Sequence, residues 1–301
     1  MAHFRRNVPL AAFVSALWPG ASGSNMDPPQ GLMAPVQVAH LPFERNWAHL
    51  PEDPRHLFIE VGANGFELER DDIGALLEDG PGGFLLTFEP LLDKYSSLLA
   101  RQGLSYGPLG LQHRRGLALP FAVDECEAGA VRTFQVAHVD GCSSLRNFAD
   151  DFSSAWQTAD VRWNPWVAKS CAQIRDRRTV PCVSLGEVVG TWLGGRRIAR
   201  LKIDAQGSDL DVVRSLGRFV DRVLFVHLEM VNDGAARLYQ GALGCRGIVG
   251  AMRAMGFVPA DNRLARGVCN VSFDVWGGTS KRGAEFNVDF VRREYRLLWR
   301  G

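Results

Sequence analysis

The sequence lacks the features that mark several large classes of protein. No apolar run reaches the roughly 18 residues that a membrane-spanning helix needs. The formal net charge of the 301 residues is only +1, so we expect neither nucleic acid nor a membrane surface as a partner. The chain contains no internal repeat, and its 46% hydrophobic and 22% charged residues are typical of a globular domain.

Cysteines at the spacing of metal ligands are also missing. The six cysteines form no Cys-x-x-Cys pair, and none stands at zinc-finger spacing from a histidine, so no metal site is expected. A domain of this size does not depend on disulfides, and we therefore expect buried free thiols. The even number of cysteines would permit disulfides if the chain entered the secretory pathway.

Residues 1–50 are rich in proline, glycine and serine and show no sustained hydrophobic period. We interpret them as an extension that precedes one domain at residues 51–301. Two arginines, an apolar segment at residues 8–18 and small residues after it follow the order of a secretory signal, although Pro9 favours a disordered tail. The expected compartment is therefore the cytoplasm, or the secretory pathway if the segment is a signal.

Strand and helix patterns alternate through the domain. Strands are predicted at residues 57–61, 84–88, 117–123, 131–139, 198–203, 220–228 and 268–275. Helices are predicted at residues 67–78, 91–99 and 248–255, and after a capping box of Ser208 and Asp211. This alternation predicts a parallel sheet with helices on both faces, a doubly wound α/β fold of the Rossmann type. Residues 145–180, with three tryptophans, fit it poorly and are predicted to be an insertion.

A turn of small residues follows the first predicted strand, where a doubly wound sheet binds its ligand. Gly62 and Gly65 let the backbone bend sharply and approach a ligand closely. The predicted cofactor contacts in this turn are Gly62, Ala63, Asn64 and Gly65. The turn lacks the third glycine of the dinucleotide fingerprint, and the chain has no triphosphate loop. Glu60, at the strand end, would repel a pyrophosphate but attract a cationic ligand.

A second carboxylate, Glu89, ends the second predicted strand, and Pro90 stops that strand cleanly. Glu89 lies 24 residues after Gly65 (89 − 65), near the roughly 20 expected of a carboxylate that binds ribose hydroxyls. A ligand with a ribose at one end and a cationic amino acid at the other is S-adenosylmethionine. Glu60, Glu89 and Pro90 therefore join the predicted cofactor contacts.

Further candidates lie at the ends of later strands. Asp204 is predicted to contact the cofactor or the methyl acceptor, and a carboxylate there is suited to accept the acceptor's proton. Lys202, on the same face, pairs with Asp204 or orients the acceptor. Glu229 and His227 are predicted to line an acceptor pocket, with a purely structural histidine as the alternative.

Three more polar residues stand near the predicted hairpin at residues 131–139. Ser143 and Ser144 are predicted to touch the substrate, and simple turn capping is the alternative. Asp124 is predicted to lie near the adenine edge, and the alternative is an ordinary loop charge.

These motifs together resemble the FkbM-type methyltransferases. The stretches FIEVGANG, LLTFEP, FAVDECEAGAVRTFQVAHVDGCSSL, VPCVSLGEVV and RLKIDAQGSDLDVV occur in that family's order across about residues 55–290. The resemblance implies a class I methyltransferase fold with a seven-stranded sheet, S-adenosylmethionine as cofactor and, usually, a hydroxyl as methyl acceptor. Glu60 stands where aspartate is commoner, and Gln206 replaces the usual glutamate. The second change weakens the case for a metal or a proton acceptor at that position.

We therefore predict an O-methyltransferase that acts on a small molecule or a glycan, with Lys202, Asp204 and Glu229 as its catalytic candidates. One alternative is a nicotinamide-dependent oxidoreductase on the same sheet, against which the missing third glycine and Glu60 argue. The other is a non-catalytic relative that keeps the fold as a binding module, an alternative that Gln206 leaves open.

Overall fold

The protein is described from a computed structural model. The described residues are 56–64, 83–99, 116–150, 170–233, 237–269 and 285–298. Several sequence predictions lie outside these ranges: the N-terminal extension, the helix at 67–78, Gly65, the three tryptophans of the insertion and most of the strand at 268–275.

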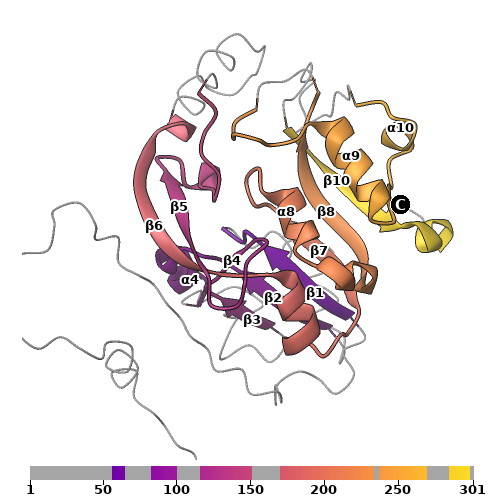
Figure 1. The fold of residues 1–301 in the computed structure, drawn as a ribbon, viewed down its shortest axis with the longest axis horizontal. Helices are drawn as coiled ribbons and strands as arrows, with labels where there is room; N and C mark the ends of the chain where they lie inside the picture. The colour runs from indigo at the N-terminus through magenta and orange to yellow at the C-terminus, as the bar shows by residue number, and fades with distance from the viewer. Residues whose placement is uncertain are drawn as a thin grey trace, which may run out of the picture. The chain divides into compact units, whose positions relative to one another are not determined.

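Seven strands form one large sheet (Figure 1). They are β1 (His56–Val61), β2 (Gly83–Phe88), β3 (Gly116–Leu119), β7 (Ile198–Ile203), β8 (Val223–Val231), β9 (Phe257–Pro259) and β10 (Glu285–Arg292). Their order is β3-β2-β1-β7-β8-β10-β9, and within this sheet β10 runs antiparallel to both of its neighbours while the other pairs are parallel. The predicted seven-stranded, mostly parallel α/β sheet is confirmed.

The strand order reverses between β1 and β7. β2 and β3 extend the sheet on one side of β1, and the chain then returns to place β7 on the other side. β1 and β7 are parallel and paired up to Val61 and Ile203. Ligands of open α/β sheets bind beyond the carboxyl ends of the strands at such a reversal. The residues after Val61 and Ile203 therefore occupy the position expected of a binding site.

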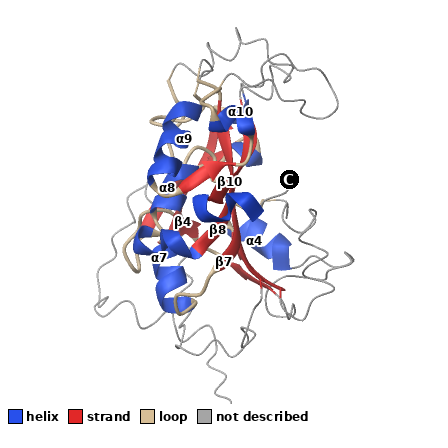
Figure 2. Ribbon diagram, turned by 90° about the vertical axis from the view of Figure 1, so that its right-hand side faces the viewer, coloured by secondary structure: helices blue, strands red, loops and turns tan. Residues whose placement is uncertain are grey.

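Helices cover both faces of the sheet (Figure 2). On one face lie α7 (Leu185–Glu187), α8 (Asp209–Arg214) and α9 (Cys245–Ala254). Their apolar side chains pack against alternate strand residues such as Ile59 and Leu201. On the other face α4 (Leu92–Leu99) places Leu98 against Phe58. Neighbouring residues of a strand point to opposite faces, so β1 contributes to both layers.

Short helical segments complete the described structure. They are α10 (Asn262–Ala265), η2 (Asp140–Cys142), η3 (Val188–Trp192), η4 (Gly217–Arg222) and η5 (Arg293–Leu298). No helix in the described ranges is both long enough and apolar enough to cross a bilayer.

A second sheet has the order β4-β6-β5 and contains β4 (Ala122–Val123), β5 (Val131–Ala137) and β6 (Ile174–Val183). The strand predicted at residues 117–123 is thus divided between two sheets, and Pro120 stands at the break, where a residue without an N–H ends a strand readily. Residues 174–180, which the sequence assigned to the insertion, belong to β6 and pair with β5. Residues 174–177 are exposed and three of them are charged, which hides the strand from hydrophobic patterning.

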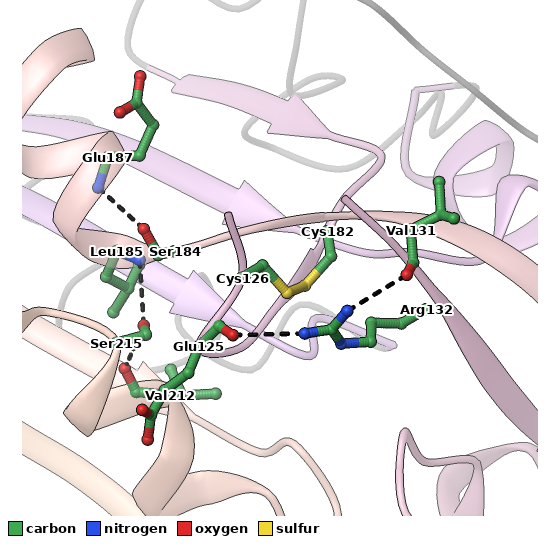
Figure 3. The surroundings of a disulfide bond; sticks show 10 residues. All are labelled: Glu125, Cys126, Val131, Arg132, Cys182, Ser184, Leu185, Glu187, Val212 and Ser215. Carbon is green, nitrogen blue, oxygen red and sulfur yellow. Dashed lines mark hydrogen bonds between the residues drawn. A yellow bond between two sulfur atoms is a disulfide. The ribbon is translucent and has the colours of Figure 1, made fainter. Parts of the chain in front are cut away.

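All six cysteines form disulfides, so the prediction of free thiols is wrong. The pairs are Cys126–Cys182, Cys142–Cys171 and Cys245–Cys269, with sequence separations of 56, 29 and 24 residues. Figure 3 shows the first of them between the loop after β4 and β6, beside Arg132, which donates to the Glu125 carbonyl oxygen at 3.4 Å. Disulfides that close loops of this length stabilise a fold by roughly 2–4 kcal/mol each.

Two local predictions on β8 and α8 also need correction. β8 begins at Val223 rather than at residue 220, because the 3-10 segment η4 precedes it. The capping box is not formed, since Ser208 makes no side-chain cap and the Asp211 N–H donates to its carbonyl oxygen at 2.9 Å. The Asp211 carboxylate instead pairs with Arg146 and Arg214.

Candidate functional site

A cavity of about 280 Å³ lies beyond the carboxyl ends of β1, β2 and β7, and we call it the first cavity. Seven residues predicted from the sequence line it: Gly62, Ala63, Asn64, Glu89, Pro90, Ser143 and Asp204. These residues come from three strand ends and from the segment after β5, so the fold brings together positions far apart in the chain.

Gly62 makes the bend at the end of β1. Its φ is +76°, and a Cβ there would lie 1.9 Å from the Asp204 carbonyl oxygen. Its N–H donates to the Phe88 carbonyl oxygen at 3.0 Å, which joins the bend to the end of β2. A residue with a side chain would therefore be strained and would push β7 away from β1. Glycine is required here for the close approach of the two strand ends.

Glu89 is fixed at the end of β2 by two backbone groups. The Asn64 N–H donates to Oε2 at 3.2 Å, and the Leu91 N–H donates to Oε1 at 3.0 Å. Glu89 is 4% exposed. Burial raises the pKa of Glu89 to about 7, while the two N–H groups and Lys94 oppose the rise. The result is an immobile carboxyl group on the cavity wall with free acceptor capacity for hydroxyls.

Asp204 follows β7 and belongs to a chain of hydrogen bonds. The Gln206 Nε2 donates to Asp204 Oδ1 at 2.6 Å, and Gln206 Oε1 lies 2.7 Å from the Tyr239 hydroxyl. That hydroxyl is also 2.9 Å from the Cys142 carbonyl oxygen, so it donates to one of the two at a time. Gln206 has a φ of +50°, a left-handed conformation uncommon outside glycine. Such conformations persist where surrounding contacts hold them, often at functional sites.

The opposite wall of the first cavity comes from the second sheet and the segment after it. Phe121, Val123, Phe134 and Leu145 make this wall apolar. Near it, Lys94 of α4 pairs with Asp140 of η2, with Nζ and Oδ2 2.7 Å apart. The cavity lining therefore holds three carboxyl groups and one ammonium group that is already paired, a balance that favours a cationic ligand.

The two predicted serines shape this wall. Ser143 Oγ accepts the Ala137 N–H at 3.1 Å, and Ser144 Oγ donates to the Gln206 carbonyl oxygen at 2.7 Å. Ser143 lines the cavity, whereas Ser144 is fully buried and supports the Gln206 loop. Both serines make the local hydrogen bonds that the capping alternative requires, and their contact with a substrate stays a prediction.

A second cavity of about 190 Å³ adjoins the same loop. Its lining includes the predicted Glu229, together with Asp209, Glu285 and Tyr239. Burial and the nearby charge of Asp204 raise the pKa of Asp209 and that of Glu285 to about 7. Burial raises the pKa of Tyr239 well above its usual value. Near neutral pH, Asp209 and Glu285 are therefore present in both the protonated and the ionised form, while the Tyr239 phenol stays un-ionised.

Glu60 and Lys202 pair with each other in the sheet interior. Lys202 Nζ lies 3.6 Å from Glu60 Oε1 and 3.9 Å from Asp204 Oδ2. The Glu60 side chain is 0% exposed and that of Lys202 is 4% exposed. Neither Glu60 nor Lys202 is among the described residues that line the two cavities. That Glu60 contacts a cofactor directly stays a prediction, and so does contact of Lys202 with an acceptor. This geometry favours neither contact.

Two other candidates lie apart from both cavities. His227 Nδ1 is 2.9 Å from Asp289 Oδ1, and Arg200 approaches the same carboxylate at 3.5 Å, so His227 belongs to an ionic cluster in the middle of the sheet. This contact matches the structural alternative for the histidine. Asp124 follows the lining residue Val123, and its N–H donates to the Val183 carbonyl oxygen at 3.2 Å.

Sequence reasoning missed several residues of the two cavities. They are Lys94, Phe121, Phe134, Asp140, Leu145, Asp209, Tyr239 and Glu285. Asp140 and Asp209 lie within the motif stretches named above. Their acidic side chains near predicted site residues were the sequence signal that could have identified them. Tyr239 and Glu285 come from segments without any motif, and only the fold brings them to the site.

In the described ranges, no group of three or more His, Cys, Asp or Glu side chains is arranged to hold a metal ion.

The strand order with β10 antiparallel between β8 and β9, and the cavity at the reversal, define a Rossmann-like α/β methyltransferase fold of class I. The sequence model of the family described as "Methyltransferase FkbM domain" matches residues 60–257. The chain therefore belongs to the FkbM methyltransferase family. Neither a curated protein nor a solved structure matches it.

Proposed function

We propose that this methyltransferase uses S-adenosylmethionine to methylate a hydroxyl group of a small molecule or a glycan. The observation that carries the proposal is the meeting of the Gly62 bend, the Glu89 carboxyl group and Asp204 on one cavity. The bend leaves space next to the backbone, and the carboxyl groups favour a ligand that has both hydroxyls and positive charge.

The residues present fit this cofactor. Glu89 is oriented by two backbone N–H groups at the end of β2, where a carboxylate accepts hydrogen bonds from ribose hydroxyls. Asp204, with 30% of its side chain exposed, offers a partner for a sulfonium or ammonium group. Phe121, Phe134 and Leu145 provide an apolar surface suited to a flat purine ring.

When bound, S-adenosylmethionine supplies a methyl group attached to a positively charged sulfur. The residues of the chain hold the acceptor hydroxyl in line and exclude water. We assign the proton that the hydroxyl loses to the Asp204 carboxylate, whose Oδ1 is held by the Gln206 Nε2–H at 2.6 Å. Gln206, in place of the family's usual glutamate, orients this carboxylate through its amide and does not itself take the proton.

Binding of S-adenosylhomocysteine to the full chain, measured by calorimetry, tests the cofactor. Saturable binding that weakens in Glu89→Ala and persists in Asp221→Asn, an exposed acid on η4, supports the proposal. A folded chain that binds neither S-adenosylhomocysteine nor S-adenosylmethionine contradicts it. Incubation with labelled S-adenosylmethionine and extracts of metabolites or glycans, followed by mass spectrometry, then identifies the acceptor.

We also propose that the protein works in an oxidising compartment such as the secretory pathway. Its three disulfides support this, because such bonds persist mainly where thiols are not kept reduced. The order of basic, apolar and small residues near the N-terminus agrees with the same route. Alkylation of the denatured protein isolated from its own cells, without reductant, should modify no cysteine. Six alkylated cysteines would contradict the assignment.

A further inference from the structure

We propose that the second cavity binds one sugar ring of the methyl acceptor through the Asp209 carboxyl group. The inference concerns the acceptor and rests on the proposed function for its role in methylation. The cavity measures about 190 Å³, below the roughly 300–1,000 Å³ of pockets that enclose a whole drug-sized molecule. It therefore suits one part of a larger ligand.

Asp209 supplies the observation that points to a ligand. Its Oδ2 accepts the Gly207 N–H at 3.2 Å, and backbone groups of Ala205 and Glu229 oppose the rise in its pKa, but within the described part of the chain Oδ1 has no hydrogen bond of good geometry. The residue is 5% exposed and lines the cavity. A buried polar atom without a partner is costly, and the cost is recovered when a ligand donates a hydrogen bond to it. Asp209 is therefore prepared for a donor that enters the cavity.

The chemistry around Asp209 suits hydroxyl groups. Glu229 and Glu285 line the same cavity, and burial raises the pKa of Asp209 and of Glu285 to about 7. Near neutral pH, Asp209 and Glu285 therefore act both as donors and as acceptors, as hydroxyl groups do.

The remaining lining suits the less polar face of a sugar ring. Leu210, Met230, Leu238, Leu243 and Ile248 provide apolar surface. Arg146 and Arg214 also line the cavity, and both pair with Asp211. This ion cluster offers charged partners to the hydroxyl groups at the edge of the ring. A ring with an apolar face and a polar edge matches such a mixed lining, whereas a wholly apolar ligand would leave Asp209 Oδ1 without a hydrogen bond.

The loop between Asp204 and Asp209 separates this cavity from the first one. The Tyr239 ring packs over Gly207, where an added Cβ would lie 2.6 Å from the ring, and its hydroxyl reaches Gln206. Gln206 in turn bonds to Asp204, which lines the first cavity. A ring held by Asp209 would thus lie across this partition from Asp204, the carboxylate to which we assign the acceptor's proton.

Saturation-transfer NMR with the full chain and the methyl glycosides of glucose, galactose, mannose and N-acetylglucosamine tests the inference. We expect at least one glycoside to bind, and its dissociation constant to rise about tenfold or more in Asp209→Asn. Ala242→Phe, which fills the cavity from its lining, should abolish the signal, and Asp221→Asn should leave it unchanged. Each variant is compared only if its circular dichroism and melting temperature show a folded chain.

The inference is overturned if no glycoside binds, if binding survives in both cavity variants, or if putrescine binds at this cavity while the glycosides do not. Calorimetry with S-adenosylhomocysteine on the same samples separates the two proposals. Cofactor binding without glycoside binding contradicts the sugar subsite alone. Glycoside binding that depends on Asp209, in a chain that does not bind the cofactor, contradicts the methyltransferase role and leaves a carbohydrate site.

Discussion

Lys202 of β7 and Glu60 of β1 form a buried ion pair across neighbouring strands, with Nζ and Oε1 3.6 Å apart. The two residues are also paired in the strand register. Lys202 Nζ lies 3.9 Å from Asp204 Oδ2, so the ammonium group stands between an interior carboxylate and the carboxylate of the first cavity. Glu60 is therefore placed to influence the cavity through Lys202 rather than by touching a ligand.

Removal of one member of this pair should be far more harmful than removal of both. We expect Lys202→Met or Glu60→Met alone to lower the free energy of unfolding by about 3–5 kcal/mol, because each leaves a buried charge without its main partner. The double variant Glu60→Met with Lys202→Met should recover most of that loss. Urea unfolding of the four proteins measures the coupling, and additive single effects would contradict a structural ion pair.

Glu89 should act on the ligand as well as on the fold. Loss of hydrogen bonds from a ligand to a charged carboxylate costs about 1.5–3 kcal/mol each, so we expect Glu89→Ala to weaken S-adenosylhomocysteine binding by about 10- to 100-fold. Glu89→Gln keeps one acceptor oxygen and should fall between. Calorimetry at pH 8 measures both variants. Affinity that is unchanged in Glu89→Ala would show that the carboxyl group does not bind the cofactor.

The stability of the ligand-free chain should fall as the pH rises from about 5 to 8. Burial raises the folded-state pKa of Glu89, Asp209 and Glu285 to about 7, so between about pH 4.5 and 7 the folded chain binds more protons than the unfolded chain. Each group then contributes a loss of as much as about 3 kcal/mol by pH 8. The lowered pKa values of Asp93, Asp176 and Asp289 affect stability only at more acidic pH.

Melting temperatures at pH 5.5 and pH 8 measure this effect. The difference should shrink in Glu89→Gln, which removes one of the three titrating groups, and should persist in Asp221→Asn. A melting temperature that rises between these two pH values would contradict the proposed protonation of the buried acids.

Glu60 and Glu89 illustrate what the sequence can and cannot predict. Both are acidic residues at the end of an apolar run, so the pattern places both at the binding edge of the sheet. Glu60 is the last residue but one of β1 and points into the sheet interior, whereas Glu89 lies one residue beyond β2 and lines the cavity. In the register of β1 and β2, Glu60 stands beside Thr87, two residues before Glu89, so Glu60 lies within the paired strands while Glu89 lies beyond their end. Strand ends cannot be read from sequence to that precision.

The strands β1, β2 and β7 were predictable because each consists mostly of apolar residues and is followed by a turn or an acidic residue. β6 was not, since its first residues are charged and exposed and only pairing with β5 makes them a strand. The disulfides join cysteines 24 to 56 residues apart, and such pairings depend on tertiary proximity. The second cavity escaped prediction for the same reason.

Gly62 should tolerate no side chain. In Gly62→Ala a Cβ would clash with the Asp204 carbonyl oxygen at a positive φ, and we expect a loss of at least about 3 kcal/mol in the free energy of unfolding. Gly129→Ala is the matched control, because Gly129 has nearly the same φ, +77°, with nothing within 4 Å of the added Cβ. It should cost only about 1 kcal/mol. Equal losses in urea unfolding would assign the effect to backbone strain alone.

The Cys142–Cys171 disulfide should support the first cavity as well as the fold. Cys142 ends η2, whose Asp140 and Gly141 line that cavity, and its carbonyl oxygen lies 2.9 Å from the Tyr239 hydroxyl. We expect the double variant Cys142→Ala with Cys171→Ala to lose roughly 2–4 kcal/mol of stability and also to bind S-adenosylhomocysteine several-fold more weakly. Differential scanning fluorimetry and calorimetry measure the two effects on the same samples.

The Cys245–Cys269 disulfide provides the matched control. It closes a loop of similar length, with a sequence separation of 24 residues against 29, but neither cysteine lines the first cavity among the described residues. Removal of both cysteines should therefore lower the melting temperature by a comparable amount and leave cofactor affinity unchanged. If both disulfides affected affinity equally, the weaker binding would follow from general loss of stability. A loss of cofactor affinity in the Cys142–Cys171 variant alone would instead establish that this disulfide holds η2 in position beside the bound cofactor.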